Sequence, residues 1–321
     1  MANIAAQPER DPGRDRRPDL TSTLIPLSDG VYGWIQEPGT WWINNAGAVA
    51  GEDSVVLIDT CATRRRTERF LAAVATATEG RPIRLAVNTH LHGDHTYGNV
   101  LLPDTTVIVA HERTRAGLLA DFILAATPPL WSPLPDWGVT QVRPPTVTVS
   151  DGAVLYAGSR RIELRHPGYP AHTEGDLVAW LPDERVLFCG DLLFHQVTPL
   201  VFMGTVAGAL RSLDWLTGFD AAVVVPGHGP LITGAELPNV LAAHERYYRF
   251  LLDTADQAGD RSPLELATGL DLGEFADWPD QERLVLNLHR AYADRSDTAL
   301  DITAAFMDAV AWHGGPFPCT A

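Results

Sequence analysis

The sequence contains no lysine, because all 24 basic residues are arginine. Schiff-base chemistry on carbonyl substrates and the attachment of pyridoxal phosphate both need a lysine amine. The chain can do neither. If the protein acts on carbonyl carbon, something other than an iminium ion must serve as the electron sink.

Cysteine is also scarce, and Cys61, Cys189 and Cys319 lie far apart in the 321 residues. No CxxC pair occurs, which argues against both a disulfide framework and a thiolate zinc site. No apolar run approaches the ~18–20 residues that span a bilayer. The N-terminus has no apolar core of the kind found in a signal peptide. These absences predict a cytoplasmic protein that has no membrane segment.

Basic residues are fewer than acidic ones, and the formal net charge is −16. A nucleic-acid-binding protein normally presents a basic face, so this class is disfavoured. The length fits one large domain or two small ones. Residues 1–20 are polar and rich in proline and arginine, and we expect them to form a disordered or loosely packed tail.

Periodic segments alternate between strand and helix up to residue 235. Strands are expected at 31–36, 41–50, 55–60, 84–90, 107–111, in short pieces over 146–192, and at 221–229. Helices are expected at 63–79, near 96–101, from 112 and at 206–217. This order predicts an α/β sandwich of two sheets with helices outside. Residues 125–145, rich in proline and tryptophan, are expected to form an ordered loop or lid.

Residues 236–321 are expected to be purely helical. Helical apolar periods run over 236–256, 279–294 and 298–312. Ser262 and Glu265 have the spacing of a capping box around a shorter helix. We therefore predict a catalytic domain at 21–235 and a helical extension at 236–321 packed on it.

The segment HLHGDH carries most of the predicted chemistry and follows a predicted buried strand. Residues two apart in an extended segment point the same way, so His90 and His92 can offer imidazole nitrogens to one metal ion. Asp94 and His95 lie where the chain turns, so they can face a second ion. Nitrogen and oxygen donors of this kind suit Zn²⁺, and next Fe or Mn.

Three further candidate ligands each follow a predicted strand. They are His172 in HPGYPAHTEGD, Asp191 in FCGD and His228 in PGHGP. A carboxylate at the end of a buried strand is costly unless it is paired or bound to metal. Each of the three is a weak signal alone, and a solvated loop is the alternative for any histidine-rich segment.

Together these motifs, in the order HxHxDH, His, Asp, His, resemble the metallo-β-lactamase-fold superfamily over about residues 25–230. The resemblance implies the αββα sandwich of that family and two metal ions, with zinc favoured and iron or manganese as alternatives. It assigns one ion to His90, His92 and His172, the other to Asp94, His95 and His228, and the bridging position to Asp191. It also implies that Asp59 supports the ligands through hydrogen bonds, whereas its spacing alone would equally suit a turn or a helix cap.

Catalytic candidates are Asp94, Asp191 and His195. His195 could reach the pocket as an acid or base, or could be an ordinary half-buried histidine. Aromatic candidates for a substrate pocket are Trp41, Trp42, Tyr97, Trp131, Trp137 and Tyr169, with core packing as the alternative for each.

A closer resemblance is to the lactamase-type cyclases of bacterial aromatic (type II) polyketide pathways. It is carried by WWINNAGAVAGEDSVVLIDT (41–60), VNTHLHGDHTYGN (87–99), PLWSPLPDWG (129–138) and the stretch from LVLNLHRAYAD to AWHGGPFPC (284–319). The resemblance implies intramolecular aldol condensation and dehydration of a polyketide thioester on an acyl carrier protein, with thioester hydrolysis in some members.

A general metallohydrolase of a small thioester or lactone, similar to glyoxalase II or a lactonase, competes for the same metal ligands. A metal-stabilised scaffold without activity is a third reading, which the complete ligand set disfavours. We expect neither a nucleic-acid nor a membrane partner, and the sequence is compatible with a homo-oligomer.

Overall fold

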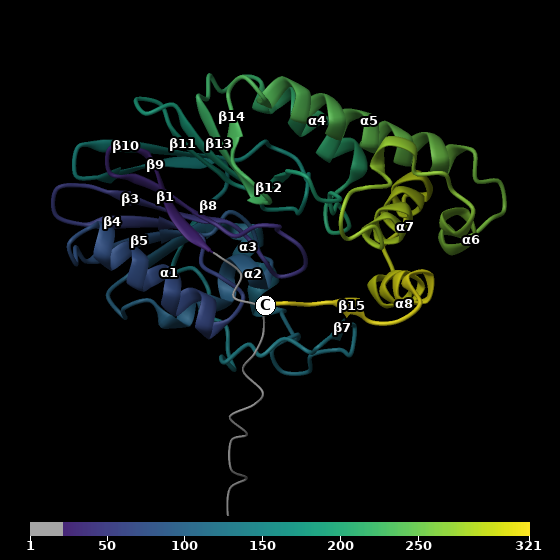
Figure 1. Cartoon of the computed structure of the whole chain (residues 1–321), viewed down its shortest axis with the longest axis horizontal. Helices are drawn as coiled ribbons and strands as arrows, with labels where there is room; N and C mark the ends of the chain where they lie inside the picture. Colours follow the sequence, from purple (N-terminus) through teal and green to yellow (C-terminus); the bar gives the residue numbers. More distant parts are fainter. Residues whose placement is uncertain (1–21) are drawn as a thin grey trace, which may run out of the picture.

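The computed structural model describes residues 22–321, so the tail predicted for residues 1–20 lies outside the described residues. Two β-sheets lie face to face (Figure 1). The seven-stranded sheet has the order β1 (Thr23–Ser28), β2 (Val31–Ile35), β3 (Ala46–Ala50), β4 (Val55–Ile58), β5 (Ile83–Val87), β6 (Val107–His111), β8 (Val147–Val149). The six-stranded sheet has the order β14 (Ile232–Thr233), β13 (Val223–His228), β12 (Val186–Phe194), β11 (Val178–Leu181), β10 (Arg160–Arg165), β9 (Gly152–Ala157).

The space between the sheets is filled by branched and aromatic side chains. Val49 and Val56 of the first sheet belong to the same buried cluster as Leu181, Phe188 and Val225 of the second. β-Branched and aromatic residues pack well on a pleated surface, and alternate residues of each strand point to this interface. The predicted two-sheet sandwich is confirmed.

Helices cover the outer face of each sheet (Figure 1). Beside the first sheet lie α1 (Arg64–Ala77), α2 (Gly93–Thr96), the 3-10 helix η1 (Tyr97–Leu101) and α3 (Glu112–Leu119). Phe70 and Val74 of α1 are buried in a cluster with strands of that sheet. The second sheet is covered by α4 (Val206–Leu216) and α5 (Leu237–Asp256).

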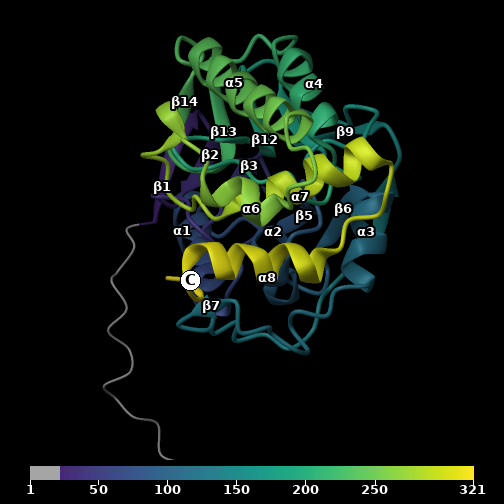
Figure 2. The same cartoon turned by 90° about the vertical axis from the view of Figure 1, so that its right-hand side faces the viewer.

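The C-terminal helices lie at one end of the sandwich (Figures 1 and 2). They are α6 (Pro263–Thr268), the 3-10 helix η2 (Gly273–Phe275), α7 (Arg283–Ser296) and α8 (Ile302–His313). The predicted capping box is present, since the Ser262 hydroxyl accepts from Glu265 N and the Glu265 carboxylate accepts from Ser262 N. Their apolar faces share one buried cluster with α4 and α5.

The segment 125–145 is irregular, as expected, except for β7 (Trp131–Ser132). This strand pairs in parallel with β15 (Phe317–Pro318), which ties the loop to the C-terminal end of the described chain (Figure 1). The strand expected over 41–50 begins only at Ala46, because residues 41–45 form a turn and an extended link. None of the helices within residues 22–321 combines the length and the apolar character needed to cross a bilayer.

The topology brings four strand ends to one edge of the sandwich. β4 and β5 are parallel neighbours, and so are β12 and β13. Asp59 directly follows β4, His90 is the third residue after β5, Asp191 lies within β12 and His228 ends β13. Polar side chains at such strand ends are held by a rigid scaffold and can face one another across the two sheets.

Candidate metal centre

The first group of candidate ligands consists of His90, His92, His172 and Asp191, whose ligand atoms all lie within 4.8 Å of one another. His92 Nδ1 lies 3.1 Å from His90 Nε2 and 2.9 Å from His172 Nε2. The loop after β5 supplies His90 and His92, while His172 comes from the loop before β11. The structure therefore brings together residues that are 80 positions apart in the chain.

The second group consists of Asp94, His95 and His228. Asp94 Oδ2 lies 3.2 Å from His228 Nε2 and 3.8 Å from His95 Nε2. Helix α2 begins directly after His92, and it places Asp94 and His95 with His228 in this second group.

Asp191 lies between the two groups. Its Oδ2 is 3.3 Å from His172 Nε2 and 3.4 Å from His228 Nε2, and its Oδ1 is 3.1 Å from His95 Nε2. One carboxylate thus reaches nitrogen atoms of both groups. This is the place that the resemblance assigns to a bridging ligand.

In four of the imidazoles, Nδ1 points away from the centre and contacts an oxygen atom that fixes the orientation of the ring. Nδ1 of His172 lies 2.7 Å from Leu200 O, and Nδ1 of His228 lies 2.9 Å from Gly39 O. The corresponding partners are Asp59 Oδ2 at 2.8 Å for His95 and Thr89 Oγ1 at 3.1 Å for His90. A carbonyl or carboxylate can only accept, so Nδ1 of His172, His228 and His95 carries a proton, and Nε2 is the nitrogen that is left to bind a metal ion.

Burial sets the protonation of the first group. It lowers the pKa of His90 well below the ordinary value and that of His172 to about 3. Burial also lowers the pKa of His92. These rings are neutral at neutral pH, which is the form that binds a metal ion.

Carboxylates dominate the second group. Burial works to lower the pKa of His95 and His228, but nearby carboxylates outweigh it and raise the pKa of His95 well above its usual range and that of His228 to about 9. Despite burial, His95 and His228 lower the pKa of Asp94 to about 2. The buried carboxylates of the centre therefore stabilise positive charge beside them. Protons on His95 and His228 supply that charge when no metal ion is bound. A divalent cation would replace those protons.

Two details test whether a metal ion fits. His95 Nε2 and Asp191 Oδ1 are buried and lie 3.1 Å apart, but neither makes a well-directed hydrogen bond, which is costly for polar atoms unless something else binds them. The separations of 2.9–3.1 Å among the first three imidazole nitrogens are close to the edge, about 3.3 Å, of a tetrahedron with metal–nitrogen bonds of about 2.0–2.1 Å. The residues fit a divalent metal ion, and their nitrogen and oxygen donors suit zinc.

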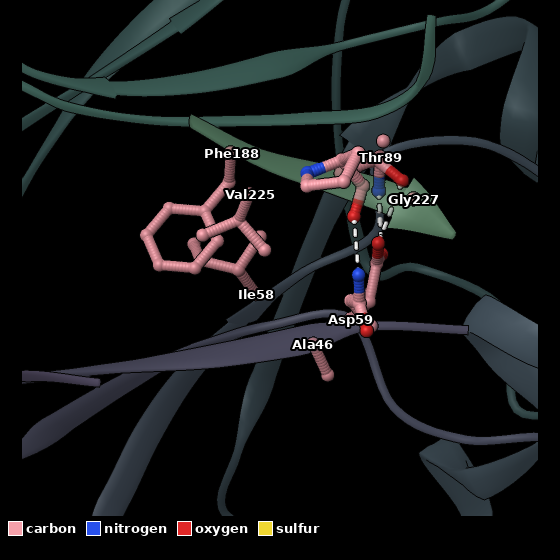
Figure 3. Close-up of a pocket in the computed structure, with 10 residues that line it drawn as sticks. Ala46, Ile58, Asp59, Thr89, Phe188, Val225 and Gly227 are labelled. Atoms are coloured by element: carbon pink, nitrogen blue, oxygen red, sulfur yellow. Dashed lines mark hydrogen bonds between the residues drawn. The ribbon is translucent and has the colours of Figure 1, made fainter. Parts of the chain in front are cut away.

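Asp59 lies near Thr89 and Gly227, between the two sheets (Figure 3). Its Oδ1 accepts from Thr89 N at 2.8 Å, and its Oδ2 accepts from Thr89 Oγ1 at 2.7 Å and from His95 Nδ1. A cavity of about 10 Å³ beside it is lined by Asn45, Thr89 and Gly227 among others, which leaves room for one water molecule at most. The structure thus places Asp59 as the acceptor that orients His95.

Most of the aromatic pocket candidates lie in the hydrophobic core. Trp41, Trp42, Trp131 and Trp137 are 3–7 % exposed, and Tyr97 is fully buried. Trp42 packs against Tyr97, Trp131 and Trp137 with ring centroids 4.6–6.1 Å apart. These side chains pack against one another in the core and do not line an open cavity. Their positions agree with core packing, which was the alternative to a substrate pocket.

Two other candidates are members of neither ligand group, although His195 N donates to His228 O at 2.9 Å. Tyr169 is half-buried beneath the guanidinium of Arg211, 4.1 Å from its ring centroid. His195 directs Nδ1 to Pro230 O at 3.1 Å and belongs to neither group of metal-ligand candidates. Neither contact points to chemistry at the centre.

Sequence reasoning missed the side chains that adjoin the most accessible of the candidate metal ligands, His92. His92 is half-buried, and its ring stacks on Phe202 with centroids 5.7 Å apart. Its Nε2 lies 3.2 Å from Met203 Sδ. Both residues follow the candidate ligands in an apolar stretch without a motif, so no sequence signal distinguished them from core residues.

Comparison with known proteins gives three findings. The family model described as "Metallo-beta-lactamase superfamily" matches residues 39–228. Acyl-coenzyme A thioesterase MBLAC2 of Bos taurus is 30 % identical over 187 residues, covering 52 % of this chain and 65 % of that protein. Hydroxyacylglutathione hydrolase of Methylococcus capsulatus is 29 % identical over 203 residues, covering 62 % of this chain and 61 % of that protein. The chain thus spans less than two thirds of the length of these relatives.

Among solved structures, a metallo-beta-lactamase from Pontibacter korlensis superposes with a TM-score of 0.57 at 21 % identity. The match covers 70 % of this chain and 99 % of that one. At this level of identity the likeness concerns the fold alone.

Proposed function

The chain belongs to the metallo-beta-lactamase superfamily, and on that basis we propose that this enzyme is a metal-dependent hydrolase of a thioester. The observation that carries the proposal is the position of Asp191 between two buried groups of histidine and aspartate ligands. We propose two zinc ions as its cofactors, one for each group.

The chain's own residues prepare the centre for catalysis. When bound, divalent ions of this kind lower the pKa of water towards ~7 and polarise a carbonyl oxygen. Asp59, Leu200 O and Gly39 O hold protons on the outer nitrogens of three histidines, so that their inner nitrogens stay free as donors. The burial of the ligands excludes bulk water from all of them except the half-buried His92.

The exposed side of the centre suits an acyl group. His92 is the half-buried member of the ligand set, and Phe202 and Met203 lie against its ring. An apolar wall beside the reacting centre favours an acyl chain over a charged group. The names of two relatives, an acyl-coenzyme A thioesterase and a hydroxyacylglutathione hydrolase, also point to acyl groups carried on sulfur.

The reaction balances with water alone. The oxygen of water bonds to the thioester carbonyl carbon, the carbon–sulfur bond breaks, and one proton of the water leaves with the sulfur as a thiol. The products are a free acid and a free thiol.

The test measures thiol release from acyl-coenzyme A substrates of increasing chain length, with metal-loaded and chelator-treated enzyme. We expect metal-dependent release of coenzyme A that is lost in Asp191→Ala and kept in Glu163→Gln. Glu163 is a buried carboxylate on β10 that pairs with arginines, outside both ligand groups. Full activity in Asp191→Ala, or activity that survives metal removal, would contradict the proposal.

A second candidate is cyclisation of a polyketide thioester held on an acyl carrier protein. It is favoured by the absence of lysine, since aldol chemistry without an iminium ion needs another electron sink. The condensation forms a carbon–carbon bond between an α-carbon and a second carbonyl carbon of one chain, and dehydration releases one water.

A one-ring poly-β-ketone thioester offered to the purified enzyme separates the two candidates. A product with a new ring, lighter by one water than the thioester substrate or than the acid released from it, supports the cyclase. Release of the uncyclised acid alone supports the hydrolase and rejects the cyclase.

A further inference from the structure

The segment 198–201, between β12 and α4, is bound by the buried side-chain amide of Asn287 in helix α7. Asn287 is fully buried, and its side-chain oxygen accepts from Val201 N at 2.8 Å. Its side-chain nitrogen donates to Pro199 O at 2.8 Å and to the Tyr247 hydroxyl at 3.0 Å. The amide therefore binds the backbone on both sides of Leu200.

Leu200 is the residue whose carbonyl oxygen orients a metal-ligand candidate. His172 Nδ1 lies 2.7 Å from Leu200 O, which directs His172 Nε2 to within 2.9 Å of His92 Nδ1 and 3.3 Å of Asp191 Oδ2. Asn287 binds the preceding peptide group through Pro199 O and the carbonyl's own peptide group through Val201 N. Because a peptide group is planar, this also fixes the direction in which Leu200 O points.

We propose that Asn287 is a positioning residue for His172, so that the C-terminal helical extension sets the geometry of the first ligand group. Acting through Leu200, it holds the ring with the proton on Nδ1 and the lone pair on Nε2. A ligand imidazole is usually fixed by a hydrogen bond to its outer nitrogen, and loss of that support costs metal affinity.

Helix α7 anchors the same segment at a second point. Arg283 Nη1 donates to Thr198 O at 2.9 Å, and its guanidinium lies 4.8 Å from the centroid of Trp41. Arg283 and Asn287 are one helical turn apart and therefore share a face. The face of α7 that meets the segment is thus polar at two successive turns, whereas the remainder of the helix interface is largely apolar.

The second ligand group gives an internal reference. His228 is oriented by Gly39 O, which belongs to another loop, and none of the described hydrogen bonds of Asn287 reaches that loop. A positioning role predicts an effect confined to the first group. A merely structural role predicts a general loss of stability that affects both groups alike.

The experiment titrates zinc into the metal-free full-length chain in competition with a chromogenic chelator. We expect the wild type to bind two ions and Asn287→Leu to bind one of them about tenfold more weakly, near the lower end of the 10- to 100-fold cost of losing such support. The affinity for the other ion should stay within twofold of wild type.

Two control variants lie on the same helix. Leu288→Ala removes a fully buried apolar side chain and lowers stability without removing a hydrogen bond. Tyr292→Phe removes one hydrogen bond from α7 to a different carbonyl, Arg261 O. Both should bind zinc as the wild type does. The proposal is wrong if either control lowers the affinity for one zinc ion as much as Asn287→Leu does. It is also wrong if Asn287→Leu lowers the affinity for both ions equally.

A double-mutant cycle tests whether the effect passes through His172. In a His172→Gln background, Asn287→Leu should cause no further loss of zinc affinity, whereas in a His228→Gln background the tenfold loss should persist. Additive losses in both backgrounds would overturn the proposal. Should Asn287→Leu fail to fold, Asn287→Asp retains the acceptor for Val201 N and removes the donor to Pro199 O and to the Tyr247 hydroxyl.

The proposal rests on the metal centre of the proposed function, and a zinc-independent measurement separates the two. In the metal-free chain, ¹⁵N NMR of the histidine rings should show His172 with its proton on Nδ1, with the signal assigned by its loss in His172→Gln. Asn287→Leu should shift this ring towards a mixture of tautomers, while Tyr292→Phe should not. A wild type that binds no divalent ion refutes the proposed function, whereas an unchanged tautomer refutes the positioning role.

Discussion

Replacing Asp59 with asparagine should weaken metal binding far more than it weakens the fold. In the native chain Asp59 Oδ1 accepts from Thr89 N, while Oδ2 accepts from Thr89 Oγ1 and from His95 Nδ1. Asparagine has nearly the same shape but offers one acceptor and one donor. Either orientation of the amide therefore leaves one mismatched contact.

The mismatch acts on the tautomer of His95. If the amide oxygen faces Thr89 N, the NH₂ group faces His95 Nδ1 and drives the proton to Nε2, where it blocks the ligand lone pair. If the amide is flipped, its NH₂ group meets Thr89 N–H, and two donors oppose each other in a buried site. Loss of such outer support typically costs 10–100-fold in metal affinity, which corresponds to about 1.4–2.7 kcal/mol.

The assay is a zinc titration of the metal-free variant beside a thermal denaturation of the same sample. We expect the ion that binds more weakly to be the one held by Asp94, His95 and His228. The metal-free variant should still unfold in a cooperative thermal transition. Glu163→Gln makes the same carboxylate-to-amide change on β10, away from the centre. If Asp59→Asn binds two ions with wild-type affinity, the argument from the tautomer is refuted.

Three further predictions concern other positions. In Gly227→Ala the new Cβ would lie 1.8 Å from Asp191 Oδ1, so the carboxylate must move, and we expect at least a tenfold loss of zinc affinity and of thiol release. Burial lowers the pKa of His244 to about 4; the unfolded chain, with an ordinary pKa near 6.5, binds a proton first, so this site costs stability as the pH falls from 6.5 towards 4. In the metal-free chain His244 should by itself account for about 2 kcal/mol of the loss at pH 5. His244→Gln should therefore lose about 2 kcal/mol less than the wild type, as measured by urea unfolding at pH 7.5 and 5. Trp41 Nε1 donates to the buried Glu282 carboxylate at 2.5 Å, so Trp41→Phe should lower the free energy of unfolding by about 1–3 kcal/mol without changing KM for a short acyl thioester.

Each of these predictions has a control and an opposing outcome. Gly269→Ala, where no atom lies within 4 Å of the new Cβ, should leave zinc binding unchanged. Trp34 Nε1 is buried without a partner, so Trp34→Phe should cost less than Trp41→Phe. Equal stability losses in the two tryptophan variants, a raised KM in Trp41→Phe, or the same pH response in His244→Gln and wild type would each show that the corresponding argument fails.

The sequence determined the elements and the local ligand motif by itself. Apolar periods fixed the core faces of α4, α5, α7 and α8, because an amphipathic helix must bury one face. The spacing within HLHGDH also indicated that His90 and His92 belong to one ligand group and Asp94 and His95 to another. This division follows from an extended backbone that is followed by a turn. His172, Asp191 and His228 were predicted as ligands only from the family resemblance, because the sequence around a lone histidine or aspartate does not indicate metal binding.

Only the tertiary structure decided what surrounds the centre. Trp41, Trp42, Trp131 and Trp137 could have lined a pocket or filled a core, and the packing of each ring on the next placed them in the core. Long-range pairing cannot be inferred from composition, and in this loop even the short strand β7 forms only because β15 lies beside it.

The link from α7 to His172 was equally invisible in the sequence. Asn287 acts through backbone atoms 86 and 88 positions away, and any residue can supply a carbonyl or an amide N–H. The identity of Leu200 therefore carries no trace of its role. The sequence specified which side chains could hold metal, whereas the fold decided which backbone groups hold those side chains in place.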